Sequence, residues 1–421
     1  MFLSGRRIFL LAVGGYVAYL FYVPVPSDIN EPQKYRAVVA FQKFLLNMVA
    51  IRSLFDDSPA TRVRRFRDSL TALRMFLPSG TSYATEVKLT KVIADGVKVH
   101  IYQPPGSEDE PPLPGFIYIH GGGLALFDAE HYDGLTRKLS ANLNAVVMSI
   151  DYQRPPDCVF PIPFEESLKA TKWFMRRSKE YNVDVNRIGI GGDSAGGYLS
   201  ATVSQAITDD KSIPDLKLQI LIYPWLQILD LNTPSYQKYE HDFGTGGVMP
   251  RDTMALYSAM HLYGNDTTDD IIRSFSANKH IAETFRDSHL YKKRLSHKLL
   301  PDQFRNDNFY IIPPSIPVPE SGSESPIWDA KQDLFQDARL TPLLRRGLSG
   351  LPPAYIITMG YDPLRDDGIM YAEHLKEAGV EVTWRHYPTA FHGAVWVAPG
   401  INFQDGDEIL KEIYEYIKVT L

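Results

Sequence analysis

The sequence predicts an α/β protein with a mostly parallel central sheet that is flanked by helices. Short apolar runs alternate with helix-like segments along most of the 421 residues, and this alternation produces right-handed βαβ units with parallel strands. One run, residues 145–152, is apolar almost throughout, as a strand buried on both faces requires. A third observation is the succession of strand, sharp turn and helix around Ser194.

The strands and helices can be placed in order along the chain. Val97, Val99 and Ile101 alternate with polar residues after an Asp95-Gly96 turn, which is the period of a half-buried strand. Further strands are predicted at residues 115–119, 145–152, 188–190, 216–223, 354–360 and 380–386, and helices at 164–181, 195–206, 253–263, 366–378 and 407–419. The alternation lapses between residues 230 and 350, which predicts a functional insertion that forms a cap over the mouth of a site.

These patterns divide the chain into five segments. An apolar stripe at helical spacing, including Val38, Phe41 and Leu45, predicts a helix over the core or, alternatively, a lid that touches a membrane. The proline-rich residues 312–322 are expected to form an exposed connector. The expected segments are an N-terminal anchor (1–27), a helical cap segment (28–80), the first part of the core (81–229), a cap insertion with its connector (230–350) and the second part of the core (351–421).

The N-terminus carries a targeting or anchoring signal. Residues 8–23 have no charge, follow Arg6 and Arg7, and end before Pro24. A cleaved signal peptide is the alternative, but no small-residue cleavage site follows the run, so we expect a retained transmembrane helix, although a short one. The preceding arginines predict a cytosolic N-terminus and a lumenal catalytic domain at the endoplasmic reticulum. The sequon at Asn265 is consistent with glycosylation on that side.

The sequence around Ser194 has the pattern of a nucleophile elbow. Ser194 stands between Gly192 and Gly196 at G-x-S-x-G spacing, after an apolar strand and before a helix. The glycines remove side chains where the chain reverses, so that the serine hydroxyl is exposed at the apex. The N–H of Ala195, the first residue of the helix, is expected to point at an oxyanion formed there.

The partners that such a serine needs occur elsewhere in the chain. The loop His120-Gly121-Gly122-Gly123 follows one strand, Asp362 follows another, and His392 follows a third. The order serine, acid, histidine is that of α/β-hydrolases. The sequence therefore predicts an α/β-hydrolase fold in which Ser194 attacks a carbonyl group, His392 transfers the proton and Asp362 orients the imidazole, through an acyl-enzyme intermediate.

Neighbouring residues receive supporting roles. We expect the N–H groups of Gly121, Gly122 and Ala195 to hold the oxyanion, while Gly123 permits the close turn. His120 is expected to fix this loop by hydrogen bonding, and Asp193 to be structural. Asp366 and Asp367 are rival acids, but Asp362 directly ends a strand, where a rigid element can position it.

Other classes of function are not indicated. The net charge of −6 and the absence of a long basic run argue against a nucleic-acid partner. A single cysteine and no clustered ligand spacing predict no metal site, and no G-x-x-x-x-G-K-[ST] motif is present, so no cofactor is expected. The remaining alternative is a receptor or adhesion domain that has the fold without catalysis.

These motifs together resemble one group of enzymes. The sequence resembles the hormone-sensitive-lipase group of α/β-hydrolases in four motifs that follow an N-terminal anchor. These motifs are the glycine loop at residues 120–123 and residues 192–197, 361–368 and 391–393. Within that group they resemble the branch of arylacetamide deacetylase and neutral cholesterol ester hydrolase. The resemblance covers essentially the whole chain. It implies a serine hydrolase of the endoplasmic reticulum membrane that acts on esters or amides of lipophilic compounds or on acylglycerols.

The sequence departs from that group at two places. Gln153-Arg154-Pro155 follows the Asp-Tyr pair where the group usually has Arg-Leu-Ala-Pro, and residues 124–126 are Leu-Ala-Leu where a bulky aromatic is common. Both changes are expected beside the acyl pocket. They bear on substrate preference and leave the chemistry unchanged.

Overall fold

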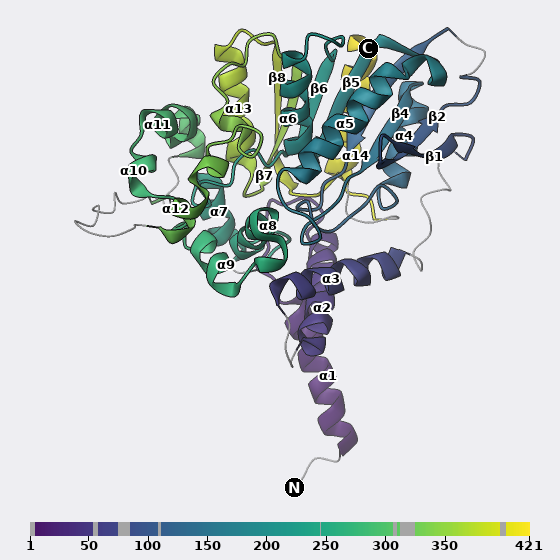
Figure 1. Cartoon of the computed structure of the whole chain (residues 1–421). Helices are drawn as coiled ribbons and strands as arrows, with labels where there is room; N and C mark the ends of the chain where they lie inside the picture. Colours follow the sequence, from purple (N-terminus) through teal and green to yellow (C-terminus); the bar gives the residue numbers. More distant parts are fainter. Residues whose placement is uncertain are drawn as a thin grey trace.

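The core of the protein is one eight-stranded sheet (Figure 1). The computed structural model describes residues 5–53, 58–74, 85–107, 111–244, 246–305, 310–311, 325–395 and 401–421. The strands are β1 (Lys88–Ala94), β2 (Val97–Gln103), β3 (Leu113–Ile119), β4 (Val146–Asp151), β5 (Val183–Asp193), β6 (Leu218–Ile222), β7 (Ala354–Tyr361) and β8 (Val382–Phe391). The predicted mostly parallel sheet, flanked by helices, is confirmed.

The strand order determines where the functional residues meet. Across the sheet the order is β1-β2-β4-β3-β5-β6-β7-β8, and only the pairs β1–β2 and β2–β4 are antiparallel. From β4 to β8 the strands run parallel. Residues that directly follow β3, β5, β7 and β8 therefore lie at the same edge of the sheet, where α/β proteins bind their ligands.

Helices cover both faces of the sheet and bury its apolar side chains. On one face Phe174, Leu199 and Ile369 join a core with the strands. On the other face Leu139 and Ile413 join a second core. The helices that supply these residues are α5 (Ile162–Arg176), α6 (Ala195–Asp209) and α13 (Arg365–Glu377) on the first face, and α4 (Asp133–Leu143) and α14 (Gln404–Thr420) on the second.

Most of the further helices lie over the edge where the parallel strands end (Figure 1). Before the sheet come α2 (Pro32–Arg52) and α3 (Pro59–Arg74). Between β6 and β7 come α7 (Pro234–Phe243), α8 (Arg251–Tyr263), α9 (Asp269–Ser276), α10 (Glu283–Arg286), α11 (His289–Leu295) and α12 (Pro326–Phe335). Of these, α10 and α11 lie at the side of the sheet near α13 (Figure 1). The proline-rich connector predicted at 312–322 lies outside the described residues.

The first helix, α1 (Gly5–Phe21), projects away from the body of the protein (Figure 1). It has 17 residues; at about 1.5 Å of rise per residue, such a helix is shorter than the ~30 Å hydrocarbon core of a bilayer. In the part of the chain that the structure describes, no helix is long and apolar enough to cross a membrane. The predicted transmembrane helix is therefore not confirmed.

Candidate active site

Ser194 occupies a strained turn between β5 and α6. Its backbone has φ 56° and ψ −120°, a conformation that costs a residue with a Cβ about 1–3 kcal/mol. The turn is fixed by its own peptide groups, because Ser194 N donates to Ile222 O at 2.9 Å and Ser194 O accepts from Trp225 N at 3.1 Å. The strained conformation is thus held by the neighbouring strand β6 and the segment that follows it.

The two glycines around Ser194 are required by a close approach of backbone segments. A Cβ on Gly192 would lie 2.2 Å from Ile119 O, and a Cβ on Gly196 would lie 2.0 Å from the same oxygen. Any side chain at either position would therefore push the elbow away from the end of β3. The G-x-S-x-G spacing thus reflects the contact between the elbow and β3.

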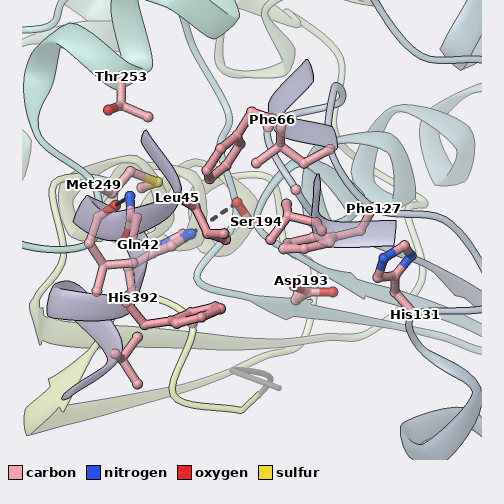
Figure 2. A pocket seen from close by; sticks show the side chains of 18 of the residues that line it. Gln42, Leu45, Phe66, Phe127, His131, Asp193, Ser194, Met249, Thr253 and His392 are labelled. Carbon is pink, nitrogen blue, oxygen red and sulfur yellow. Dashed lines mark hydrogen bonds between the residues drawn. The ribbon is translucent and has the colours of Figure 1, made fainter. Parts of the chain in front are cut away.

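Three predicted residues from three different strand ends are brought together. His392 directly follows β8, and its Nε2 lies 3.0 Å from Ser194 Oγ, within hydrogen-bond distance (Figure 2). Asp362 directly follows β7, and its Oδ2 lies 3.0 Å from His392 Nδ1. The second contact is close in distance but lacks hydrogen-bond alignment, as often occurs in free enzymes, whose catalytic contacts tighten when substrate binds.

All three side chains are buried, and Asp362 is firmly held. Its other oxygen, Oδ1, accepts a hydrogen bond from Leu364 N at 2.8 Å. The ring of Tyr223 packs against the imidazole of His392, with 4.6 Å between the ring centres. The imidazole is therefore confined between an acid, an aromatic ring and the serine hydroxyl.

The rival acids Asp366 and Asp367 have other partners. Asp366 accepts from Ser235 N at 2.7 Å and from Arg365 Nε at 2.8 Å. Asp367 accepts from Leu226 N at 3.0 Å and from the side chain of Gln227. Both carboxylates connect α13 to the segment that follows β6. Among the described residues, neither forms a hydrogen bond or ion pair with the imidazole of His392.

The glycine loop differs from the prediction at Gly121. Its N–H donates to Asp193 Oδ1 at 3.1 Å and to Tyr132 Oη at 3.2 Å, so it is not available to an oxyanion. Gly122 and Gly123 have positive φ angles of 103° and 60° and line the cavity beside Ser194. The expected oxyanion donor Gly121 is therefore corrected to an anchor of the loop, because a buried N–H needs an acceptor.

Asp193 is the acceptor that holds this loop. Besides Gly121 N, its carboxylate accepts from Tyr118 Oη and Tyr132 Oη, both at 2.8 Å. Burial raises the pKa of Asp193, although the hydrogen bonds from the two tyrosines oppose this change. The predicted structural role agrees with these contacts, which connect the elbow to the glycine loop.

His120 lies beneath the loop and is fully buried. Its Nδ1 is 2.9 Å from Gly121 O, and its ring stacks on Tyr152, with 4.3 Å between the ring centres. Burial lowers the pKa of His120 to about 3, and the contact with Gly121 opposes this change only in part. A neutral, stacked imidazole is consistent with the expected role in fixing the loop.

A cavity of about 430 Å³ adjoins Ser194 and His392. Figure 2 shows Gln42, Leu45 and Phe66 from the N-terminal helices across from Ser194. Most of the lining is apolar; it includes Val38, Leu70, Leu126, Phe127, Met249, Tyr257 and Phe391. In the part of the chain that the structure describes, no group of side chains suited to hold a metal ion occurs.

Comparisons with known proteins agree with this fold. A family model described as the alpha/beta hydrolase fold matches residues 116–287 and 326–396. The chain belongs to the α/β-hydrolase fold family. It is 35% identical to neutral cholesterol ester hydrolase 1 of Pongo abelii over 412 residues, covering 95% of each chain. It is 33% identical to arylacetamide deacetylase of Oryctolagus cuniculus over 422 residues, covering 98% of this chain and 99% of that one.

Solved structures of esterases share the architecture of this hydrolase. A hyperthermophilic esterase from the archaeon Pyrobaculum calidifontis superposes with a TM-score of 0.59 at 26% identity, covering 90% of this chain and 97% of that one. A thermostable carboxylesterase cloned from a metagenomic library gives a TM-score of 0.61 at 25% identity, covering 87% and 98%. The resemblance to the hormone-sensitive-lipase group and the prediction of an enzyme that hydrolyses ester bonds are confirmed.

Sequence reasoning missed several residues of the hydrolase site. Tyr118 and Tyr132 hold Asp193, and Tyr223 packs on His392. None of them belongs to a catalytic motif. One available signal was the alternation of side chains in β3, which places Phe116 and Tyr118 on the same face and the Tyr118 hydroxyl near the end of the strand.

The loop anchor leads to a prediction. Asp193→Asn is expected to lower the free energy of unfolding by about 1–3 kcal/mol, because at least one buried donor loses its acceptor. Ester turnover by the folded variant should fall about ten-fold or more, because the glycine loop is no longer held in place. Urea unfolding and initial rates measure the two effects. The control is Asp215→Asn, at an exposed position. Equal free energies of unfolding and equal turnover in the two variants would contradict the role of Asp193 in anchoring the glycine loop.

Proposed function

We propose that this protein is a serine esterase in which Ser194 is the nucleophile, His392 the general base and acid, and Asp362 the group that orients the imidazole. The observation that supports this most is the 3.0 Å separation between His392 Nε2 and Ser194 Oγ. The base is within reach of the proton that it must remove, which is the first geometric requirement for general-base catalysis.

The proposed reaction has two halves. In the first, Ser194 Oγ attacks the ester carbonyl carbon while His392 takes the hydroxyl proton, and the resulting imidazolium then donates that proton to the leaving alcohol. In the second half, water attacks the acyl-enzyme with the same proton transfers, which releases the acid. Asp362, 3.0 Å from Nδ1, stabilises the positive charge of the imidazolium in both halves.

The oxyanion is assigned to the N–H groups of Gly122, Gly123 and Ala195. Gly122 and Gly123 line the cavity with Ser194, and Ala195 is the first residue of α6, so its N–H has no acceptor within the helix. One such donor contributes about 3–4 kcal/mol to transition-state stabilisation, as measured in another serine hydrolase. Gly121 donates its N–H to Asp193 and thereby holds the glycine loop in place.

The substrate class follows from the lining of the cavity. Apolar side chains from α2, from α3 and from Leu126 and Phe127 after the glycine loop surround Ser194, so lipophilic acyl or alcohol groups gain the most from binding there. Leu126, at one of the positions where the sequence departs from its group, lines this space. We therefore propose esters of lipophilic small molecules or acylglycerols as substrates, with aryl amides as a second group. Two relatives, a cholesterol ester hydrolase and an arylacetamide deacetylase by name, support this choice.

A fluorophosphonate probe tests the proposed chemistry. The wild-type protein should be labelled at Ser194, and Ser194→Ala should not be labelled. A panel of p-nitrophenyl esters of increasing chain length, with an aryl acetamide, then ranks the substrates. A wild-type protein that stays unlabelled and hydrolyses none of them would instead indicate a receptor or adhesion domain.

Attachment to a membrane through α1 is part of the proposal. It is supported by the exposed side chains of this helix, among them Phe9 at 66% and Leu11 at 64%. Location at the endoplasmic reticulum with the domain in the lumen stays a prediction. Asn265, which is exposed, offers a test: unchanged mobility after endoglycosidase treatment, together with removal of the domain from sealed microsomes by protease, would contradict that location.

A further inference from the structure

The catalytic cavity has an apolar mouth. Of its described lining residues, the exposed ones are Ala37 and Phe41 on α2 and Ile401 just before α14. Phe41 is 42% and Ile401 is 44% exposed. All three side chains are apolar, so the entrance beside α2 exposes to its surroundings the kind of surface that soluble proteins usually bury.

This apolar surface continues from the mouth along the N-terminal helices. On α2, Phe44, Leu46 and Ile51 are exposed in addition to Phe41. On α1 the exposed large apolar side chains are Phe9, Leu10, Leu11, Val13, Tyr16, Val17, Tyr19 and Phe21. An exposed apolar surface of this kind marks a contact with a partner or a membrane.

The two helices are held side by side. Asn47 Nδ2 donates to Tyr16 Oη at 3.3 Å. Lys43 Nζ donates to Tyr22 O at 2.9 Å and lies 5.5 Å from the centre of the Tyr19 ring. Because Lys43 and Asn47 belong to α2, these contacts join the exposed part of α1 to the helix that forms the wall of the cavity.

The charge of the same helices favours a lipid surface. Within their bounds, α1 and α2 contain six Lys and Arg residues and no Asp or Glu, although the whole chain has a net charge of −6. Basic residues beside exposed aromatic and aliphatic side chains are typical of helices that lie in a membrane interface, where anionic headgroups attract them. A soluble protein partner would need a large apolar surface of its own to cover the exposed side chains of α1 and α2.

We propose that a lipid bilayer covers the surface formed by the exposed apolar side chains of α1, α2 and Ile401, and that the ester enters the cavity from the bilayer past Phe41. This inference rests on the proposed ester hydrolysis and specifies its substrate class, which is esters dissolved in the membrane. Phe41 connects the two environments, since it is exposed on one side and lines the cavity on the other.

Comparing a membrane-embedded ester with a water-soluble ester tests the proposal. The full chain is given a long-chain 4-methylumbelliferyl ester in vesicles of phosphatidylcholine and phosphatidylserine, or p-nitrophenyl acetate in solution. The variant is Phe44→Asp/Ile51→Asp, at two exposed positions that do not line the cavity. We expect hydrolysis of the vesicle ester to fall at least about ten-fold, since two apolar contacts with lipid are lost, while hydrolysis of the soluble ester and the melting temperature stay unchanged.

The control is Val419→Asp on α14, which introduces a single aspartate at another apolar side chain, 90% exposed, and should leave both rates unchanged. The proposal is overturned if the double variant hydrolyses the two esters in the wild-type ratio. It is also overturned if the double variant separates a dimer into monomers while the vesicle rate persists, because the surface would then join two copies. Failure of the wild-type protein to hydrolyse either ester would contradict the proposed function instead.

Discussion

Ser194→Ala should lower kcat for ester hydrolysis by about 10⁶-fold, the scale measured when the nucleophile of another serine hydrolase is removed. Without Oγ no acyl-enzyme can form, and His392 loses the group that lies 3.0 Å from its Nε2. The fold should persist, because the turn is held by the backbone hydrogen bonds of Ser194 and not by its side chain. Initial rates with a p-nitrophenyl ester, together with melting curves, measure both quantities.

The matched control for this variant is Ser200→Ala, which removes a buried hydroxyl from the same helix α6. Its turnover should stay within about three-fold of the wild type, since small surface or packing changes away from the site rarely alter the chemical step. If Ser194→Ala retains more than a small fraction of wild-type turnover, the nucleophile is another group.

The second large effect is expected at Asp362. Asp362→Asn should lower kcat by about 10⁴-fold, as the equivalent change does in a serine protease, because an amide favours the wrong tautomer of the imidazole. Asp362 Oδ2 lies 3.0 Å from His392 Nδ1, and Oδ1 keeps its bond from Leu364 N at 2.8 Å. The geometry of the site should therefore survive the substitution, and the loss should appear in kcat more than in KM.

Asp366→Asn is the informative comparison. Asp366 is buried and accepts from Ser235 N and Arg365 Nε, so its neutralisation leaves a buried guanidinium without its charged partner. We expect the free energy of unfolding to fall by about 3–5 kcal/mol, while kcat per folded molecule stays close to that of the wild type. Equal losses of kcat in the two variants would show that the acid has been assigned to the wrong residue.

How far the sequence predicts the fold depends on how each strand is buried. Strands β3 to β7 each pair with two neighbours, and their apolar runs predicted them to within about five residues. The edge strand β8 was predicted at residues 380–386 and extends to Phe391. The edge strand β1 (Lys88–Ala94) was missed. It pairs with one neighbour, β2, and its side chains are exposed or half-buried except at Ala94, so its sequence contains two lysines and only a short apolar run at its end.

The same distinction applies to the site. The turn around Ser194 is a local structure, and its glycines and serine are adjacent in the chain, so the motif is readable from the sequence. The partners of the glycine loop come from distant positions. Asp193 is 72 residues from Gly121, and nothing in the glycine loop itself indicates that one of its N–H groups is already used by this carboxylate.

The sequence by itself predicted that Ser194, Asp362 and His392 each come after a strand, and the parallel order of the strands then places all three at one edge of the sheet. Only the tertiary structure decided which glycine N–H groups remain free for the substrate and that helices from the N-terminal segment form the wall of the cavity. The physical reason is the separation along the chain of the residues that interact. Turn geometry and strand burial depend on neighbouring residues, whereas the pairing of a buried donor and the exposure of a helix face depend on segments that meet only when the chain has folded.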